Sequence, residues 1–344
     1  MKGIKVDNVG GEYQFTEDLP KLVPGPNQLL VKSIYGAVNP VDEMMRDSGL
    51  LVTSWPWTPC CDAAGTVVQI GSDVTNFQVG DQVFGCQGVG FPGSGGAAEY
   101  CLFREDCAAK KPANISLAAA ATVGVGSETA AVGLWSCLNI AVPDLQNLPA
   151  VSDEWVLIIG GTGNVGGYAV QLVKLSGYKV IATVSANAVE AAKALGADEA
   201  IDYKLPVEDQ VAKIKEATNG GLHRIFDCTV FNIDVVRKVL EAIKDEPGQK
   251  YFASVNDWED FGVLAGDTKF NPVSIGPVAR PDAEQLNADV SKYLKVIPAL
   301  LESRKLRVGE HTVLEGTGFD KFIEGVKLQT SGGAKKVVVK FQDE

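Results

Sequence analysis

The chain has 344 residues, 46% hydrophobic and 22% charged, which is long enough for two domains that each bury a core. Its formal net charge of −12 argues against nucleic acid or an anionic membrane as a partner, but it does not exclude a local phosphate site. The sequence shows no signal region and no apolar run near the ~20 residues of a membrane span. Seven cysteines without disulfide-scaffold spacing fit a reducing compartment, so we expect a cytoplasmic protein.

The first 110 residues alternate between short apolar runs and turn pairs such as Gly25-Pro26 and Gly80-Asp81. Short strands with few helices predict an irregular, β-rich domain. Two helices then lead toward the middle of the chain, the first capped by Ser116. The predicted elements are strands at 28–35, 64–71 and 81–85, and helices at 117–122 and 127–138.

The most informative segment is residues 154–167. An apolar run at 156–159 predicts a strand buried on both faces, and a glycine-rich turn follows it and opens a helix. Such a turn brings backbone amides and a helix dipole to a pyrophosphate, although tight helix–sheet packing alone would also explain the glycines. We expect the G-x-G-x-x-G loop to bind a dinucleotide through Gly161, Thr162, Gly163, Asn164, Val165 and Gly166.

Strands and helices alternate after this loop, which predicts right-handed βαβ crossovers and a doubly wound parallel sheet. A sixth strand is expected at 273–276, and then a long helix, two short strands and a helix that we expect to return to the first domain. The predicted strands are 178–184, 199–201, 224–228, 250–254, 312–314 and 336–341, and the predicted helices are 188–195, 207–218, 233–243, 283–303 and 319–329.

Short motifs recur in a fixed order along nearly the whole chain: Asn39-Pro-Val-Asp42, Pro59-Cys-Cys-Asp-Ala-Ala-Gly65, Gly96-Ala-Ala-Glu-Tyr100, Thr129, Gln171-Leu-Val-Lys174, Leu195-Gly-Ala-Asp198, Asp202-Tyr203, Phe226-Asp-Cys228 and the ending 331–339. Together they resemble the medium-chain dehydrogenase/reductase superfamily, in its branch of zinc-independent quinone oxidoreductases and enoyl reductases. Segments 175–183 and 218–228 resemble the fungal trans-acting enoyl reductases of that branch. The resemblance implies a GroES-like, β-rich catalytic domain at 1–126 and 282–344, a Rossmann domain at 127–281, and a cleft between them.

Zinc-dependent members of that superfamily hold a catalytic ion with three side chains. The matching positions here are Asn39, Cys61 and Val125, of which only the cysteine is a suitable zinc ligand. We therefore predict an enzyme without a metal. Conjugate reduction suits such a site, because hydrogen-bond donors can stabilise an enolate without a Lewis acid.

The resemblance also implies site residues. Asn39 would lie near the nicotinamide and donate to the substrate carbonyl, unless Asn39-Pro40 is only a turn, and Thr129 would contact the nicotinamide side. Met44, Met45, Trp55, Trp57 and Phe91 would either line an apolar cleft or pack the β domain.

No carboxylate follows the second Rossmann strand, where NAD enzymes grip the ribose hydroxyls. Ser185 and Asn187 stand there instead and favour NADPH. By resemblance, Tyr203 lies near the adenine, Lys174 serves the phosphate and Lys336 touches a cofactor phosphate or stays solvated; Cys228 completes the predicted cofactor contacts.

We therefore predict an NADPH-dependent, zinc-independent reductase of activated C=C bonds. Its substrate would be a small molecule, such as an enone or a polyketide chain carried by a synthase. A quinone oxidoreductase and a non-catalytic NADPH-binding protein remain open as alternatives, and so do monomer and homodimer.

Overall fold

The computed structural model describes residues 1–230, 232–332 and 335–344, which form two compact units. Unit 1 comprises Met1–Glu128 and Ile275–Glu344, and unit 2 comprises Thr129–Ser274. Residues 275–281, which the sequence assigns to the second domain, belong to unit 1, where Arg280 donates to the carbonyl of Leu51 at 2.6 Å.

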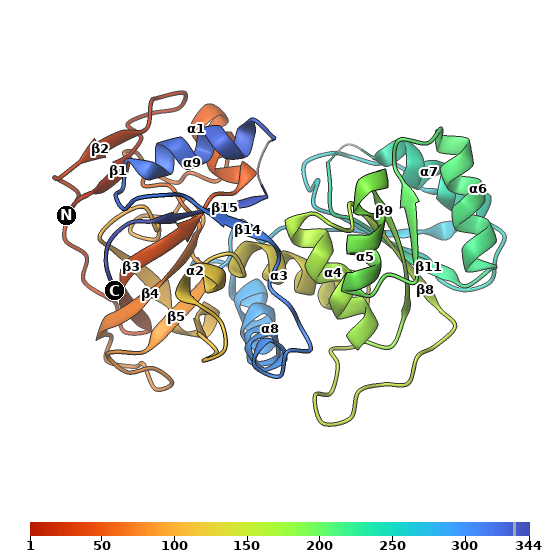
Figure 1. Ribbon diagram of the computed structural model, residues 1–344, viewed down its shortest axis with the longest axis horizontal. Helices are drawn as coiled ribbons and strands as arrows, with labels where there is room; N and C mark the ends of the chain where they lie inside the picture. Colours follow the sequence, from red (N-terminus) through yellow and green to blue (C-terminus); the bar gives the residue numbers. More distant parts are fainter. Residues whose placement is uncertain (231, 333–334) are drawn as a thin grey trace. The chain divides into compact units, whose positions relative to one another are not determined.

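Unit 2 is built on a six-stranded parallel sheet in the order β10-β9-β8-β11-β12-β13 (Figure 1). The chain enters at the centre with β8, moves outward to β10, and then crosses to β11 on the other side, as doubly wound dinucleotide-binding sheets do. The strands are β8 (Trp155–Ile159), β9 (Lys179–Val184), β10 (Glu199–Asp202), β11 (Leu222–Asp227), β12 (Tyr251–Ser254) and β13 (Lys269–Pro272).

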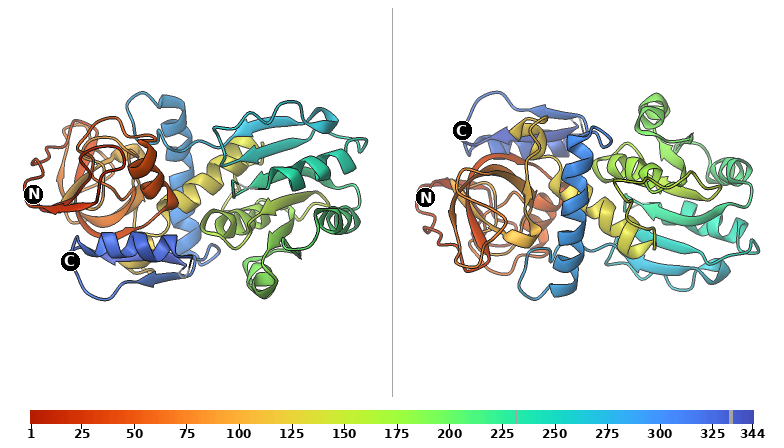
Figure 2. Two further views of the ribbon diagram at one scale, coloured as in Figure 1. Left: turned by 90° about the horizontal axis from the view of Figure 1, so that it is seen from above. Right: turned by 90° about the horizontal axis from the view of Figure 1, so that it is seen from below.

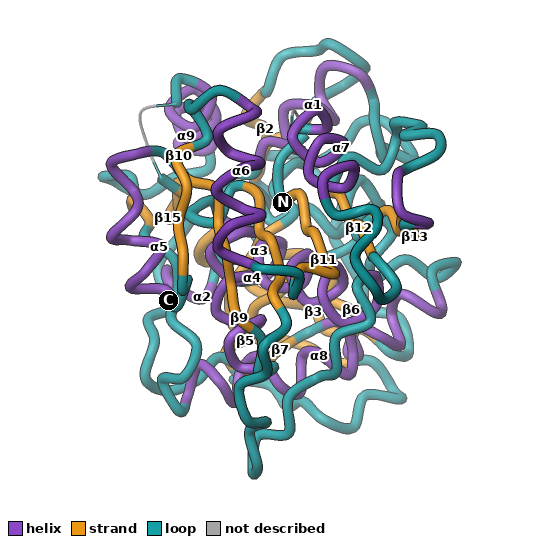
Figure 3. The backbone as a smooth tube through the Cα atoms, turned by 90° about the vertical axis from the view of Figure 1, so that its right-hand side faces the viewer, coloured by secondary structure: helices purple, strands orange, loops and turns teal. Residues whose placement is uncertain are grey.

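Helices α4 (Asn164–Leu175) and α5 (Val189–Leu195) lie on one face of this sheet, and α6 (Val207–Thr218) and α7 (Ile233–Ala242) lie on the other (Figures 1 and 2). Ile214 and Val239 bury their side chains against Leu157 and Ile225 of the central strands. Figure 3 looks onto this second face, with α6 and α7 over the strands. Both faces of the sheet are therefore covered, which explains its continuous apolar runs.

Two elements of unit 2 differ from the sequence-based prediction. The sixth strand is β13 at Lys269–Pro272 rather than 273–276, because Phe270 and Asn271 pair with β12 and Pro272 ends the strand. The helix predicted at 127–138 is α3 (Gly124–Ala131) continued by a π-helical turn, η2 (Val132–Cys137). Gly133 lies on this turn, and a Cβ there would meet the Phe226 ring at 2.4 Å.

Unit 1 contains a seven-stranded, mostly antiparallel sheet in the order β14-β15-β3-β4-β5-β7, with β6 paired to β3. Leu29, Val31, Val67 and Phe103 form the centre of its core. Strands β1 (Gly3–Lys5) and β2 (Gln14–Thr16) pair separately. The sheet strands are β3 (Gln28–Ala37), β4 (Asp62–Ile70), β5 (Gln82–Cys86), β6 (Tyr100–Arg104), β7 (Ala109–Lys110), β14 (His311–Val313) and β15 (Lys336–Lys340).

Helix α1 (Pro40–Ser48) is absent from the sequence-based prediction, which takes Asn39-Pro40 as a turn or a site motif. Pro40 is compatible with the first helical turn, Asn39 and Asp42 form a capping box, and Gly49 ends the helix at φ 74°. The other helices of unit 1 follow the prediction within two residues: α2 (Leu117–Ala120) with its Ser116 cap, α8 (Glu284–Glu302) and α9 (Lys321–Thr330).

The two units therefore have the predicted fold classes: unit 1 is β-rich, and unit 2 is a doubly wound parallel sheet of the Rossmann type. Among the helices that the structure describes, none combines the length and apolarity that crossing a bilayer requires.

Candidate functional site

The carboxyl edge of the unit 2 sheet gathers most of the predicted cofactor residues. Strand β8 ends at Ile159, the glycine loop follows, and α4 begins after its N-cap residue, Gly163. Within the described part of the chain, no side chain caps this helix. The amides of its first turn are therefore oriented for an external acceptor, as in anion sites at helix N-termini.

The glycines of the loop differ in the space that surrounds them. A Cβ on Gly166 would lie 2.1 Å from the Gly160 carbonyl oxygen, and one on Gly161 would lie 2.7 Å from Ala182 Cβ, so both positions allow close helix–sheet packing. A Cβ on Gly163 would come no nearer than 3.3 Å to the Gly160 oxygen, at an ordinary φ of −68°. Packing thus explains Gly161 and Gly166, whereas Gly163 leaves space in front of the helix.

Ser185, Asn187 and Tyr203 lie beyond the carboxyl ends of the next two strands. The backbone N–H of Tyr203 donates to the Val184 carbonyl at 2.9 Å, which places the tyrosine beside the start of the Ser185 segment. Ser185 Oγ lies 2.6 Å from Asn187 Oδ1. The Tyr203 side chain is exposed, and the neighbouring Lys204, which the sequence analysis does not single out, is exposed as well.

Lys174 lies at the opposite end of the strands, which corrects the expectation that it serves a cofactor phosphate. It belongs to the last turn of α4, and its ammonium contacts both oxygens of Asp198 at 2.9 Å. Asp198 also accepts the backbone N–H of Val180, at the amino end of β9. About six strand residues, or roughly 20 Å, separate this pair from Ser185 at the carboxyl end.

Cys228 directly follows β11, and its backbone N–H donates to the carbonyl of Ile159 at 3.1 Å. It therefore lies next to the glycine loop at the same edge. Burial raises the pKa of the Cys228 thiol, which disfavours the thiolate that a nucleophile requires. Beside it, the Asp227 carboxylate accepts both the backbone N–H and the hydroxyl of Thr229.

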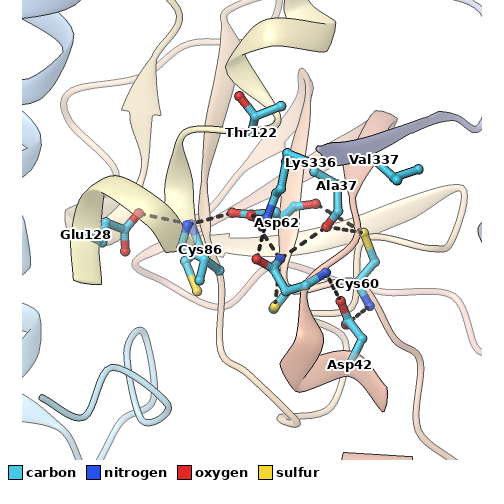
Figure 4. Close-up of polar contacts among 12 residues, drawn as sticks. Ala37, Asp42, Cys60, Asp62, Cys86, Thr122, Glu128, Lys336 and Val337 are labelled. Carbon is cyan, nitrogen blue, oxygen red and sulfur yellow. Dashed lines mark hydrogen bonds and ion pairs between the residues drawn. The ribbon is translucent and has the colours of Figure 1, made fainter. Parts of the chain in front are cut away.

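In unit 1, Asn39, Asp62 and Lys336 form a buried polar cluster. Figure 4 shows Lys336 beside Asp62. The ammonium of Lys336 donates to Asn39 Oδ1 and, at 2.8 Å, to Asp62 Oδ2. The other carboxylate oxygen of Asp62 accepts the backbone N–H of Val125 at 2.7 Å. Three segments that are distant in sequence, before α1, at the start of β4 and at the start of β15, meet at this cluster.

The amide of Asn39 is fully engaged inside the fold. Its Nδ2 donates to the carbonyl of Ala37 at 3.2 Å and to Asp62 Oδ2 at 2.9 Å, and it lies 3.5 Å from Cys61 Sγ. An amide nitrogen has only two N–H groups, so none is left for a substrate carbonyl in this geometry. The expected role of Asn39 as the donor is corrected: it orients its neighbours instead.

Lys336 also differs from the expectation that it touches a phosphate or stays solvated. Its side chain is 6% exposed and is paired with a carboxylate that is fully buried. An ammonium has three N–H groups, and the described residues supply two acceptors. The third N–H is the free donor of this cluster.

Two further buried carboxyl groups adjoin the cluster. Asp42 accepts the backbone N–H groups of Asn39 and Cys60, and burial raises its pKa to about 6. Glu128 accepts the N–H of Cys86 through one oxygen, and burial holds its pKa well above the ordinary value, which favours the protonated form. Lys336 is consequently the dominant positive charge in this region, balanced by Asp62.

The residues present do not fit a catalytic zinc ion. The positions that match zinc ligands bring together one amide, one thiol and the backbone of Val125, and the Lys336 ammonium already binds two members of the cluster. Burial and the neighbouring carboxylates disfavour ionisation of the Cys61 thiol. No group of three or more candidate metal ligands exists among residues 1–230, 232–332 and 335–344.

A cavity of about 540 Å³ borders Asn39 between α1 and α9. Met44, Val38 and Val326 give it apolar walls, and Glu43 and Asp47 lie at its rim. Of the aromatic and methionine residues that would line a cleft or pack the β domain, Met45 and Trp57 are buried in the core of unit 1, which agrees with the packing alternative. Thr129 is 5% exposed in α3.

Asp62 and Asp42 were not selected as site residues, although the sequence carries a signal for each. Asp62 interrupts the apolar run Cys60-Cys-Asp-Ala-Ala64, and a charge at such a position requires a buried partner. Asp42 stands three residues after Asn39, the spacing of a capping box. The partner of Asp62, Lys336, is 274 residues away, and no local pattern reveals it.

The sequence of the chain was compared with protein-family models and with known proteins. The chain matches the model of the alcohol dehydrogenase GroES-like domain over residues 25–113 and that of the zinc-binding dehydrogenase over residues 164–251. The enoyl reductase component of lovastatin nonaketide synthase from Aspergillus terreus is 30% identical, over 92% of this chain and 90% of its own. A trans-enoyl reductase of Pyricularia oryzae is 31% identical over 94% and 92%.

A chloroplast envelope quinone oxidoreductase homologue of Arabidopsis thaliana is 35% identical over 60% of this chain and 62% of its own. Among solved structures, an alcohol dehydrogenase superfamily protein from Novosphingobium aromaticivorans superposes with a TM-score of 0.78. That match covers 99% of this chain and all of the other, and at 24% identity it shows the shared fold alone.

Proposed function

Since this chain belongs to the medium-chain dehydrogenase/reductase superfamily, in its branch of trans-enoyl reductases and quinone oxidoreductases, we propose that it is an NADPH-dependent, zinc-free reductase of activated carbon–carbon double bonds. The family membership makes the protein an oxidoreductase with a nicotinamide cofactor. The proposal adds the choice of NADPH, the absence of a catalytic metal and the class of bond reduced. We also propose a cytoplasmic location, supported by seven free cysteines.

One observation carries the proposal: Lys336 has a free N–H in a buried cluster with Asn39, one of the positions that match the ligands of zinc-dependent superfamily members. A lysine ammonium is a weaker electrophile than a zinc ion toward an alcohol or an isolated carbonyl. It is sufficient for an enolate, which needs a preorganised, charged donor at one oxygen. The cluster therefore supports conjugate reduction over alcohol oxidation.

NADPH, when bound, supplies a hydride to the β-carbon of the alkene, and the electron pair of the C=C bond moves toward the carbonyl oxygen. We propose that Lys336 donates its third N–H to that oxygen. Asp62 and Asn39 keep the ammonium charged and fixed, because both accept hydrogen bonds from it. A proton from solvent then reaches the α-carbon and completes the reduction.

For the cofactor, the uncapped N-terminus of α4 fits a pyrophosphate, and the space before Gly163 lets it approach. We assign the 2′-phosphate of NADPH to Ser185, Tyr203 and the exposed Lys204 at the ends of β9 and β10. The absence of a carboxylate from residues 185–189 supports NADPH over NADH, since a phosphate there meets no repulsion.

For the substrate, we propose an α,β-unsaturated acyl thioester or enone, such as a polyketide chain presented by the carrier of a synthase. The names of the fungal relatives support this class. The apolar cavity lined by Met44 and Val326 has the volume to take an acyl chain.

Initial rates of NADPH oxidation with a panel of enoyl thioesters and enones, beside a panel of quinones, test the proposal. We expect turnover of the enoyl panel with saturated products and a weaker response to quinones. Turnover of quinones alone would favour the quinone oxidoreductase reading, which the plant relative supports. Tight NADPH binding without any turnover would favour a non-catalytic binding protein.

A further inference from the structure

Asn256 lies two residues beyond the end of β12, at the same carboxyl edge as the glycine loop. Only 4% of the residue is exposed. Its backbone N–H donates to Ser254 Oγ at 3.1 Å, which fixes the turn that leaves the strand. The sequence analysis gives this residue no role.

The orientation of the Asn256 amide follows from its neighbour. Nδ2 donates to Glu259 Oε2 at 2.8 Å, and a carboxylate only accepts hydrogen bonds, so the amide nitrogen must face Glu259. Oδ1 is therefore the atom that points the other way. Within the described residues, this buried oxygen has no donor.

A buried carbonyl oxygen without a donor is rare in native proteins and calls for a bound group that supplies one. The position of Asn256 indicates which group. Strand β12 lies two strands from β8, about 10 Å from the glycine loop. It lies on the side opposite β9 and β10, where Ser185 and Tyr203 would hold the adenosine half of the cofactor.

We propose that Asn256 Oδ1 accepts a hydrogen bond from the carboxamide N–H₂ of the nicotinamide ring. The inference rests on the proposed use of a nicotinamide dinucleotide and adds a residue that positions the reacting ring. The carboxamide is the amide donor at the far end of the cofactor, and its hydrogen bond to Asn256 fixes the rotation of the ring about its glycosidic bond. Glu259 acts only by holding the Asn256 amide in this orientation.

The test compares binding of NADP⁺ with binding of its 3-acetylpyridine analogue, in which a methyl group replaces the carboxamide N–H₂. In calorimetric titrations of the full chain, the wild-type protein is expected to bind NADP⁺ roughly tenfold more tightly than the analogue. Asn256→Leu, which lacks the acceptor, is expected to bind both nucleotides equally, with NADP⁺ affinity reduced to that of the analogue. Asn256→Ala is expected to behave in the same way.

Glu259→Gln is the matched control, because its side-chain oxygen can still accept from Nδ2 and so keeps Oδ1 in its orientation. It is expected to keep most of the preference for NADP⁺. Adenosine 2′,5′-bisphosphate, which lacks the nicotinamide half, is expected to bind all four proteins equally and thereby reports that each variant is folded.

A wild-type protein that does not distinguish NADP⁺ from the analogue would overturn the inference, whatever the variants do. Retention of the wild-type preference in Asn256→Leu would overturn it as well and would assign Oδ1 to an ordered water. If the wild-type protein binds neither NADP⁺ nor the bisphosphate, the proposed function itself fails, and the inference fails with it.

Discussion

The ammonium of Lys336 lies 2.8 Å from the carboxylate of Asp62, with 6% of the lysine side chain and none of the aspartate side chain exposed. Both charges are buried, so each depends on the other for stabilisation. Asp62 also accepts hydrogen bonds from Asn39 and Val125, and Lys336 also donates one to Asn39. The pair joins β4 to β15 and thereby holds the C-terminal strand in place around a fixed positive charge. The same pair therefore contributes to stability and to the chemistry that we propose.

Lys336→Met should therefore damage both properties. Loss of the ammonium leaves Asp62 buried without a counter-charge, which costs about 3–5 kcal/mol of folding free energy. Turnover of an enoyl thioester should fall by roughly 10²–10³-fold, as expected when one preorganised donor is lost. Differential scanning fluorimetry and steady-state kinetics measure the two effects.

The double variant Lys336→Met with Asp62→Asn separates stability from chemistry, because it removes both charges together. Relative to Lys336→Met, the double variant should regain a large part of the lost melting temperature and none of the lost turnover. Recovery of turnover in the double variant would show that the ammonium is structural only.

The two glycine positions of the loop should respond differently to alanine. Gly166→Ala places a Cβ 2.1 Å from a backbone oxygen and should prevent normal folding of unit 2. Gly163→Ala meets nothing closer than 3.3 Å and should fold normally, with NADPH affinity weakened about tenfold, or 1.4 kcal/mol, because the methyl group occupies the approach to α4. Thermal melts and cofactor titrations of both variants check this contrast; unchanged affinity in Gly163→Ala would contradict it.

Ser185→Asp should change the cofactor preference. A carboxylate after β9 repels the 2′-phosphate and can accept from the ribose hydroxyls, so kcat/KM should fall at least tenfold for NADPH and stay level or rise for NADH. Lys174→Met is the control, since its ammonium is paired with Asp198 at the other end of the strands. A larger loss of NADPH affinity in Lys174→Met than in Ser185→Asp would restore Lys174 as the phosphate ligand.

Glu128→Gln tests the protonation of a buried carboxyl group. The pKa of Glu128 is raised by burial in the folded protein and has its ordinary value of 4.5 in the unfolded chain. Its contribution to stability is therefore complete below pH 4.5 and is lost as the pH rises toward the folded-state pKa, by about 1.4 kcal/mol for each unit between the two values.

Glutamine cannot ionise and keeps an oxygen for the N–H of Cys86. The melting temperature of Glu128→Gln relative to wild type should consequently rise between pH 4.5 and pH 8. A difference that is constant across this range would show that Glu128 is ionised in the folded protein.

The sequence predicts the Rossmann unit well because its strands are buried on both faces and its helices end at strong signals. Helix α6 is predicted to the residue at 207–218, and Gly196 ends α5 at φ 112°. Strand β13 was misplaced because Lys269-Phe-Asn-Pro272 belongs to a sheet edge, where the apolar pattern is weak.

The candidate site was less predictable from the sequence than the fold. Asn39 and Lys336 are both identifiable by resemblance, but their contact depends on the return of β15 to β3 from the far end of the chain. Lys174 was misassigned for a related reason: a motif gives its identity, whereas only the direction of α4 shows that it lies at the wrong end of the strands.

The central claim is that this protein delivers a hydride from NADPH to the β-carbon of an activated alkene. The most direct measurement is mass spectrometry of the product formed from an α,β-unsaturated thioester and NADPH deuterated at nicotinamide C4, with both C4 epimers used in parallel. The account predicts one deuterium at the β-carbon with one of the two epimers and one solvent-derived hydrogen at the α-carbon. A saturated product without deuterium from either epimer, or no saturated product at all, would contradict it.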